Sequence, residues 1–273
     1  MSTDTHASSA VSTEAPHAAL ALKVIGLNRS FGGVKATSDV SFDVSTGTVT
    51  ALIGPNGAGK TTVFNLITNL IEPDSGDIYL TGQKITGLAP TKIAELGLIR
   101  TFQSARVFPG MTVLENVLVG RHRLIKARPL SHMFWMPGAL RTEREIAARA
   151  ISLLEMVDLS RFTHAHAAEL PMGAQKLLEV VRALMAQPRI LLLDEPAAGL
   201  NDTETAELAN LVRAIRESGI TVLIVEHNMS LVMNVADQVV VLESGSVIAS
   251  GSPREVQSNP RVVTAYLGAE IEP

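Results

Sequence analysis

Apolar and polar positions alternate over short stretches near the start of the chain, at residues 22–25 and 40–44. A period of two is typical of a strand with one buried face, so we expect antiparallel strands between about residues 21 and 49. Residues 48–53 predict a buried strand that leads into a glycine-rich turn. A helix is expected after this turn, over residues 61–70.

The second half of the chain changes to helical spacing and then to a regular alternation of elements. Apolar residues recur every three or four positions over residues 142–158, which predicts a helix. Further helices are expected at 175–186, 203–217 and 230–236, and strands at 190–193, 221–225 and 238–242. This alternation implies a largely parallel sheet covered on both faces, with an all-helical insert between about residues 105 and 185.

The composition fits one α/β domain with a small subdomain. Of 273 residues, 46% are hydrophobic and only 4% aromatic, so the core must be aliphatic and a disordered or collagen-like chain is excluded. Cysteine is absent, which excludes disulfides and thiolate metal sites. The net charge of -4 gives no basic field, so no nucleic-acid partner is expected. Apolar runs are too short to span a bilayer, so any membrane role requires docking onto a spanning partner.

Residues 121–149 carry a local excess of positive charge. Seven Lys and Arg residues against two Glu residues give the segment a net charge of +5. One interpretation is a solvated surface loop. The other is contact with anionic lipid or an acidic partner, because the cytoplasmic leaflet attracts basic segments.

One glycine-rich segment carries the chemistry. It follows the expected buried strand, precedes the expected helix and fits the pattern G-x-x-x-x-G-K-[ST]. In such a turn the backbone N–H groups point at phosphate oxygens, and the positive end of the helix adds to the attraction. Lys60 is expected between the β- and γ-phosphates, and the Thr61 hydroxyl on Mg²⁺. The candidate nucleotide-binding residues here are Gly54, Pro55, Asn56, Gly57, Ala58, Gly59, Lys60, Thr61 and Thr62.

Two adjacent acids follow the expected strand at residues 190–193. They would stand at the carboxyl edge of the sheet, where ligands of open α/β sheets bind. Two carboxylates side by side repel each other unless a cation compensates them, which favours Mg²⁺. We assign Asp194 to the metal and Glu195 to the attacking water as general base, an effect typically worth ~10²–10⁴ in rate. The sequence therefore predicts a nucleotide-hydrolysing site.

With these two motifs in place, the sequence resembles the ATP-binding cassette (ABC) ATPases over residues 21–268. The resemblance implies a RecA-like P-loop NTPase core with a parallel sheet, an N-terminal antiparallel β subdomain and an α-helical subdomain. It also implies ATP and Mg²⁺ as ligands. Residues 21–268 would be a single domain between a disordered tail at 1–20 and a short tail at 269–273.

Further landmarks match the family pattern residue by residue. Gln103 resembles the glutamine that links the metal and the water to the transmembrane partner. His227 resembles the histidine that contacts the γ-phosphate, and Phe31 the aromatic that stacks on adenine. Residues 198–201 resemble the loop through which the two cassettes of a dimer communicate, with Asn201 where Asp is usual.

The family signature, usually Leu-Ser-Gly-Gly-Gln, is altered here to Leu-Pro-Met-Gly-Ala-Gln from Leu170. Gly173 is retained and is expected to contact nucleotide, and Ala174 is a second departure. The family places the signature hydroxyl on the γ-phosphate bound by the opposite chain, and Pro171 has no hydroxyl. A homodimer would have two weakened sites, so a heterodimer with a second ATPase subunit is favoured, although a homodimer stays possible.

Residues 100–117 resemble the importers of polar amino acids and their relatives. The long basic insert at 121–149 is similar to one of the paired ATPase subunits of branched-chain amino-acid importers, and so are residues 197–201 and 259–268. That resemblance implies permease partners, a second ATPase subunit and a peripheral position on the cytoplasmic face of the inner membrane. Two other functions stay open on sequence alone. One is a soluble ABC ATPase, and the other is a regulatory cassette with weak hydrolysis, which the altered signature would suit.

Overall fold

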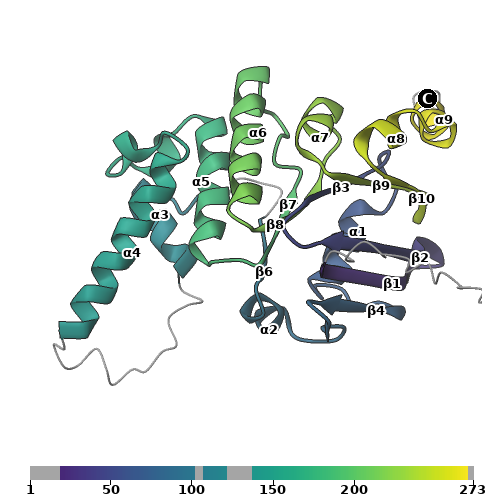
Figure 1. The fold of residues 1–273 in the computed structure, drawn as a ribbon, viewed down its shortest axis with the longest axis horizontal. Coiled ribbons are helices and arrows are strands. Elements are labelled where there is room, and N and C mark those ends of the chain that lie inside the picture. Colours follow the sequence, from purple (N-terminus) through teal and green to yellow (C-terminus); the bar gives the residue numbers. More distant parts are fainter. Residues whose placement is uncertain (1–18, 102–106, 122–136, 270–273) are drawn as a thin grey trace, which may run out of the picture.

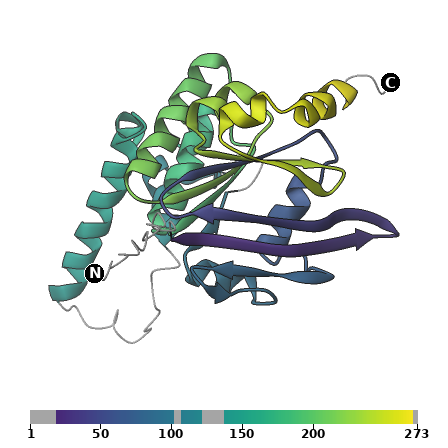
Figure 2. The same cartoon turned by 45° about the vertical axis from the view of Figure 1, so that its right-hand side comes forward.

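The computed structural model describes residues 19–101, 107–121 and 137–269. Its first part is an antiparallel sheet with the strand order β2-β1-β4-β5. β1 (Leu20–Phe31) and β2 (Val34–Ser45) form a hairpin, and β4 (Ser75–Leu80) and β5 (Gln83–Lys84) follow. The expected antiparallel strands are confirmed, and they are longer than the two alternating stretches because the hairpin continues to its turn. Figure 2 shows this hairpin, in purple, extending away from the teal and green helices.

The second sheet has six strands in the order β10-β9-β3-β8-β7-β6. Only β9 and β10 are paired antiparallel within it; the other neighbours are parallel. Its strands are β3 (Val49–Ile53), β6 (Leu98–Arg100), β7 (Ile190–Asp194), β8 (Thr221–Val225), β9 (Gln238–Glu243) and β10 (Ser246–Gly251). The strands expected from apolar runs are all present within one residue, which confirms the largely parallel sheet.

The helices follow the expected order with shifted ends. α1 starts at the lysine of the glycine-rich turn, and α5 starts three residues earlier than expected. The α-helices in the described residues are α1 (Lys60–Ile67), α2 (Pro90–Glu95), α3 (Val113–Val119), α4 (Pro137–Glu155), α5 (Met172–Met185), α6 (Asp202–Glu217), α7 (Met229–Val235), α8 (Pro253–Gln257) and α9 (Pro260–Ala269). The 3₁₀ helices η2 (Ser160–Phe162) and η3 (Ala167–Glu169) lie directly before α5.

The central strands separate two aliphatic cores. Leu191 and Leu193 of β7 face a core built with α3, α4, α5, α6 and α7. Ile190 and Leu192 of the same strand face a second core, which contains α1 and the antiparallel sheet. This alternation follows from the period of two along a strand and explains why these strands are apolar on both faces, with only Thr50, Asp194 and Thr221 as polar residues in β3, β7 and β8. Figure 1 shows α1 and the antiparallel sheet below the central strands, and α5, α6 and α7 above them.

The α-helical part lies at the end of the molecule away from the antiparallel sheet (Figure 1), where α3 and α4 pack on α5. The predicted limits of this insert, residues 105–185, remain a prediction. In the basic segment, residues 122–136 lie outside the described residues, so both interpretations of its charge stay open. Among the helices that the structure describes, none is long and apolar enough to cross a membrane.

Candidate functional site

Three parallel strands end in one row at the centre of the sheet. Leu52 of β3 pairs with Val225 of β8, and Val225 pairs with Asp194 of β7. The residues that follow these three positions therefore leave the sheet at one edge, where ligands bind in open α/β sheets. They are the glycine-rich turn, Glu195 and the segment that contains His227. The structure thus brings together three predicted parts of the site that lie far apart in the sequence.

Lys60 is held inside the glycine-rich turn. Its Nζ donates to the carbonyl oxygens of Gly54 at 2.6 Å and Pro55 at 3.0 Å, and the residue is only 7% exposed. Burial lowers the pKa of Lys60, while the nearby charge of Glu195 acts in the opposite direction. The lysine is a buried cation that has neutral acceptors from its own turn, next to an acidic residue of another strand.

The glycine-rich turn is clamped between the two sheets at Gly54 and Gly59. A Cβ on Gly54 would collide with the carbonyl oxygen of Leu242 in β9, and one on Gly59 with that of Ala36 in β2. Gly59 also has a φ of 99°, which favours glycine. Only glycine therefore allows the turn to lie this close to both sheets. Asn56 and Gly57 between them are exposed, and Thr61 and Thr62 follow on the first turn of α1.

Asp194 is the last residue of β7 and is 3% exposed. Its Oδ2 accepts a hydrogen bond of 2.6 Å from Nη2 of Arg100, the last residue of β6. The sequence alone gives no direct sign of this pair, because the two residues are 94 positions apart. The sequence contained only an indirect sign of this ion pair: a carboxylate buried at the end of an apolar strand needs a nearby cation.

Glu195 adopts a left-handed conformation with a φ of 47° directly after β7. Its backbone N–H donates to the carbonyl oxygen of Val225 at 2.9 Å, so the end of β8 fixes its backbone. The side chain is partly buried. Because a non-glycine residue at positive φ is uncommon, this turn is a local strain at the predicted catalytic acid.

Glu226 is fully buried between the segments that carry Glu195 and His227. Its Oε1 accepts the N–H of Ala197 at 2.7 Å, and its Oε2 accepts the N–H groups of His227 at 3.1 Å and Asn228 at 3.2 Å. The side chain of His227 itself is exposed. Sequence analysis passed over Glu226, although an acid between a buried strand and the predicted histidine was the available signal.

Lys176 of α5 holds the same loop from the other side. The residue is buried, and its Nζ donates to the carbonyl oxygens of Pro196 at 3.2 Å and of Ala198. Burial lowers the pKa of Lys176, and the nearby carboxylates, Glu226 first among them, act in the opposite direction. The loop after Glu195 is thus fixed by a lysine on one side and a glutamate on the other. Sequence analysis missed Lys176 too.

Gly173 is the second residue of α5, where backbone N–H groups of a helix lack intrahelical acceptors. It is buried, and a Cβ there would collide with the side chain of Glu204 in α6. Pro171 is the residue before the helix and provides no side-chain cap. The two predicted signature positions therefore lie at the start of α5, and the atoms nearest to a Cβ on Gly173 belong to Glu204 of α6 and not to the glycine-rich turn of the same chain.

Phe31 lies at the tip of the β1–β2 hairpin and is 43% exposed. The guanidinium carbon of Arg29 lies 4.9 Å from the centre of its ring, and Arg29 forms an ion pair of 2.7 Å with Asp74. The hairpin contacts the glycine-rich turn through Ala36, so Phe31 belongs to an element that adjoins the site. Gln103 lies outside the described residues.

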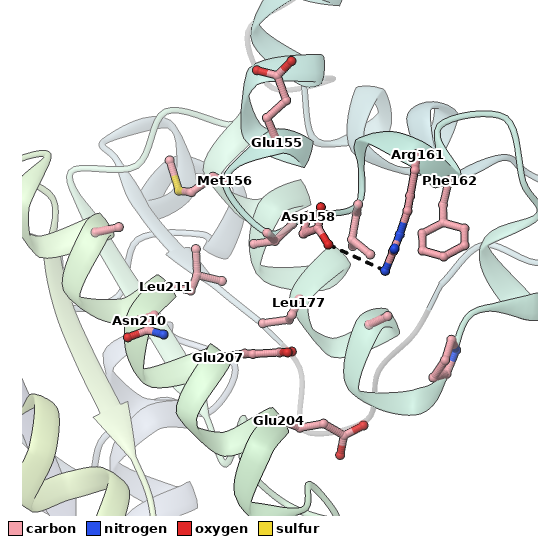
Figure 3. A pocket seen from close by; sticks show the side chains of 15 residues that line it. Glu155, Met156, Asp158, Arg161, Phe162, Leu177, Glu204, Glu207, Asn210 and Leu211 are labelled. Atoms are coloured by element: carbon pink, nitrogen blue, oxygen red, sulfur yellow. Dashed lines mark ion pairs between the residues drawn. The ribbon is translucent and has the colours of Figure 1, made fainter.

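A cavity of about 640 Å³ opens beside the start of α5 (Figure 3). Pro171 and Ala174 line one side, and Glu204, Glu207 and Asn210 of α6 line another. Figure 3 shows Asp158 and Arg161 facing each other across 3.6 Å at its rim. None of its lining residues belongs to the glycine-rich turn, so this cavity is not where the turn would hold phosphates.

Comparison with known families identifies the chain. A family model described as "ABC transporter" matches residues 37–198. A second, described as "Branched-chain amino acid ATP-binding cassette transporter", matches residues 246–272. The high-affinity branched-chain amino acid transport ATP-binding protein BraF of Pseudomonas aeruginosa is 46% identical over 248 residues, which cover 90% of this chain and 97% of BraF. LivG of Escherichia coli K12, with the same description, is 42% identical over 248 residues, with the same coverage.

Solved structures agree with the sequence matches. The ADP conformation of MJ1267, an ATP-binding cassette of an ABC transporter, has a TM-score of 0.78 and 36% identity, and covers 91% of this chain and 99% of its own. A nucleotide-free cassette from an ABC transporter has a TM-score of 0.77 and 35% identity, with 90% and 98% coverage. The expected ABC fold and the family resemblance are therefore confirmed. The chain belongs to the branched-chain amino acid group of ABC transporter ATP-binding proteins, as the ATPase subunit of a complex that also contains permease subunits.

Proposed function

We propose that this chain binds Mg-ATP at residues 54–62 and hydrolyses it to drive import of branched-chain or related amino acids. The observation that carries the proposal is the convergence at one sheet edge of Lys60, the acid pair and the segment of His227. Nucleotide hydrolysis needs a cation that binds the phosphates, a carboxylate that binds the metal and a carboxylate that activates the water.

Residues 54–62 suit a triphosphate. Lys60 is already aimed into the turn, and it would exchange neutral carbonyl acceptors for charged phosphate oxygens, which are the stronger partners. The N-terminus of α1 adds a positive end to the same place. We assign the exposed ring of Phe31 to the adenine base, in line with its place on the adjoining hairpin.

Thr61 and Asp194 fit a magnesium ion. Both offer hard oxygen donors, and Mg²⁺ is usually bound through one or two carboxylates together with the phosphates of the substrate. Arg100 contacts only Oδ2 of Asp194, and the carboxylate has a second oxygen to offer. When bound, Mg²⁺ neutralises negative charge on the phosphates. We assign Gln103 to the same metal and to the water.

Glu195 is proposed as the general base. It would accept a proton from the water that attacks the γ-phosphorus, while the bond to the bridging oxygen breaks and ADP leaves. His227 is proposed to contact the γ-phosphate, because its side chain is exposed and its backbone is fixed by Glu226. Glu226 and Lys176 hold the loop after Glu195 and so limit how far the base can move.

Two cassettes are proposed to share each nucleotide. Gly173 lies at the start of α5 and away from the turn of its own chain, in a position suited to the nucleotide of a second chain. Because Pro171 supplies no hydroxyl there, we propose that the second chain is a different ATPase subunit with a complete signature. Residues 21–268 are proposed to form the single cassette that takes part in this pairing.

A groove of about 600 Å³ is proposed as the contact for the permease. Its lining includes Phe108, Ile99 and Arg182 and therefore joins apolar surface to charge. The exposed ring of Phe108 suits insertion against a partner. Phe108 follows Gln103 by five residues in the sequence. Because Gln103 is assigned to the metal and the water, we propose that a movement of the permease at Phe108 reaches the site through this segment. Such a complex would hold this subunit at the cytoplasmic face of the inner membrane.

The proposed substrate class comes from relatives. BraF and LivG are described as high-affinity branched-chain amino acid transport proteins, and the model for residues 246–272 carries the same class. These matches favour a transporter subunit over a soluble ABC ATPase. An uptake assay with the complete transporter, in which leucine and other amino acids compete, would define the substrate.

The hydrolytic function is tested with Glu195→Gln. We expect this variant to bind Mg-ATP as the unchanged protein does, while turnover falls by about 10²–10⁴, because the general base is lost and the binding turn is intact. Calorimetry measures the binding, and phosphate release by the complex measures turnover. Lys60→Ala should lose binding instead. Hydrolysis at the normal rate by Glu195→Gln would show that Glu195 is not the base.

A further inference from the structure

Arg100 opens the segment 100–117 but has no predicted role there, yet it connects two parts of the proposed metal site. Its guanidinium is largely buried, with 11% of the side chain exposed. Nη2 donates to Oδ2 of Asp194 at 2.6 Å, and Nη1 donates to Oδ1 of Asn65 at 2.7 Å. The guanidinium carbon also lies 5.6 Å from the centre of the Phe64 ring. The side chain is therefore fixed by these two short polar contacts, by a longer one of 3.4 Å from Nη1 to the Thr68 hydroxyl at the end of α1, and by one aromatic contact.

The two short polar contacts belong to the two elements that carry the proposed metal ligands. Asp194 ends β7, and Asn65 lies in α1, four residues after Thr61. Positions four apart lie on the same face of a helix, one turn from each other. One guanidinium thus joins the strand of the carboxylate ligand to the helix of the hydroxyl ligand.

We propose that Arg100 is a positioning residue for Mg²⁺, which fixes Asp194 relative to Thr61 so that both meet the same ion. Arg100 binds one carboxylate oxygen, Oδ2, and thereby orients the other toward the nucleotide. This inference rests on the proposed function, because it concerns the metal of that site. Groups that orient metal ligands commonly contribute 10- to 100-fold to metal affinity. Arg100 itself is not a metal ligand, since its guanidinium has no acceptor.

The charge of Arg100 has an effect on magnesium affinity opposite to that of positioning, so the two roles predict changes of opposite sign. A positive charge next to Asp194 repels a divalent cation, so a purely electrostatic role would make Mg²⁺ bind more tightly once Arg100 is removed. Positioning predicts weaker binding. The sign of the change in magnesium affinity therefore separates the two roles.

The test compares Arg100→Gln with Arg216→Gln in the full chain. Arg216 forms an Arg–Asp pair of 3.0 Å with Asp237, remote from the glycine-rich turn in the fold, and is the matched control. Binding of a non-hydrolysable ATP analogue is measured by calorimetry, first in EDTA and then at increasing Mg²⁺. For Arg100→Gln we expect the affinity for the analogue in EDTA to equal that of the unchanged protein within about twofold. The Mg²⁺ concentration that gives half of the magnesium-dependent gain in affinity should be about 10- to 100-fold higher. The control should match the unchanged protein.

Further variants keep the test decisive if Arg100→Gln folds poorly. Asn65→Ala retains the ion pair with Asp194 and removes the shorter of the two contacts of Arg100 with α1, leaving the 3.4 Å contact with Thr68, so the Mg²⁺ concentration at the midpoint should rise by a few fold. Arg100→Lys retains a charge but cannot contact Asp194 and Asn65 at once. The Mg²⁺ concentration at its midpoint should therefore lie between those of the unchanged protein and of Arg100→Gln. An unchanged or lower Mg²⁺ midpoint in folded Arg100→Gln or Asn65→Ala would overturn the inference. Failure of the unchanged protein to bind the analogue at all would instead contradict the proposed function.

Discussion

Lys60 shows how burial prepares a single side chain for an anionic ligand. Burial lowers its pKa from an ordinary value of 10.5, and the charge of Glu195 offsets only part of this. The folded protein therefore binds this proton less tightly than the unfolded chain does. The resulting cost in stability is complete at pH values below the folded pKa, and it disappears as the pH rises toward the unfolded value.

A bound triphosphate should raise the pKa of Lys60 again, because it places negative charge at the ammonium group. We therefore predict that ATP affinity falls on the alkaline side, at a lower pH than an ordinary lysine would titrate. Calorimetry between about pH 7 and 10 measures this fall, and buffers with different ionisation heats reveal proton uptake. Lys60→Arg should lack the alkaline fall, because arginine stays protonated. The same alkaline profile in both proteins would assign the fall to another group.

The loop after β7 depends on contacts from two other elements. Glu226, at the end of β8, accepts three backbone N–H groups, one of which belongs to Ala197 in this loop. Lys176 of α5 donates to two carbonyl oxygens of the same loop. Because Glu195 immediately precedes the loop, the two buried charges fix the position of the proposed base without contact to a substrate.

We predict that Glu226→Gln destabilises the fold by about 1.5–3 kcal/mol, because an amide NH₂ would replace an oxygen that accepts N–H donors. Unfolding in urea measures this loss. Turnover should fall as well, since the loop after Glu195 loses a contact. Glu217→Gln, at an exposed position on α6, is the control and should change stability by less than about 0.5 kcal/mol. A loss no larger than that of the control would show that Glu226 does not hold the loop.

The elements predicted well from the sequence are those whose pattern is decided locally. Four consecutive residues of β7 and of β8 are apolar because both faces of these strands are buried, and the predicted ends differ from the observed ends by at most one residue. β6 has three residues and α3 has seven, which is too short for a period to emerge. α5 begins before its apolar face does, because Pro171 and Gly173 give no helical signal.

The same distinction between local and long-range patterns holds for the candidate site. The glycine-rich turn and the acid pair are contiguous motifs, so their positions at the sheet edge follow from strand order. Arg100 and Lys176 are defined by partners 94 and 20 to 22 residues away, and only the fold brings them together. The catalytic and binding roles of the predicted residues remain predictions, which the variants above test.

The altered signature makes a prediction for the assembled transporter. Pro171 precedes α5 with a φ of −53° and a ψ of 153°, a backbone conformation that serine also adopts at a helix start. Pro171→Ser should therefore preserve the fold and add the hydroxyl that the proposed composite site lacks. One hydrogen bond to a charged group is worth about 1.5–3 kcal/mol. In the isolated chain, where only identical chains can pair, we predict that ATPase activity rises by about 10- to 100-fold.

A comparison with the complete pair of ATPase subunits tests whether this gain arises because each site is built from two chains. With a second ATPase subunit that has a complete signature, the site at Lys60 of this chain already receives a hydroxyl from the partner. Pro171→Ser then adds a hydroxyl only at the partner's nucleotide, so total activity should rise much less than it does in the isolated chain. Pro171→Ala removes the ring without adding a hydroxyl and should leave both activities near their starting values. Phosphate release by the isolated chain and by the purified pair is measured for the unchanged protein and for both variants. Rapid hydrolysis by the isolated chain that Pro171→Ser leaves unchanged would remove the argument for two different ATPase subunits, because identical chains would then form competent sites without the hydroxyl.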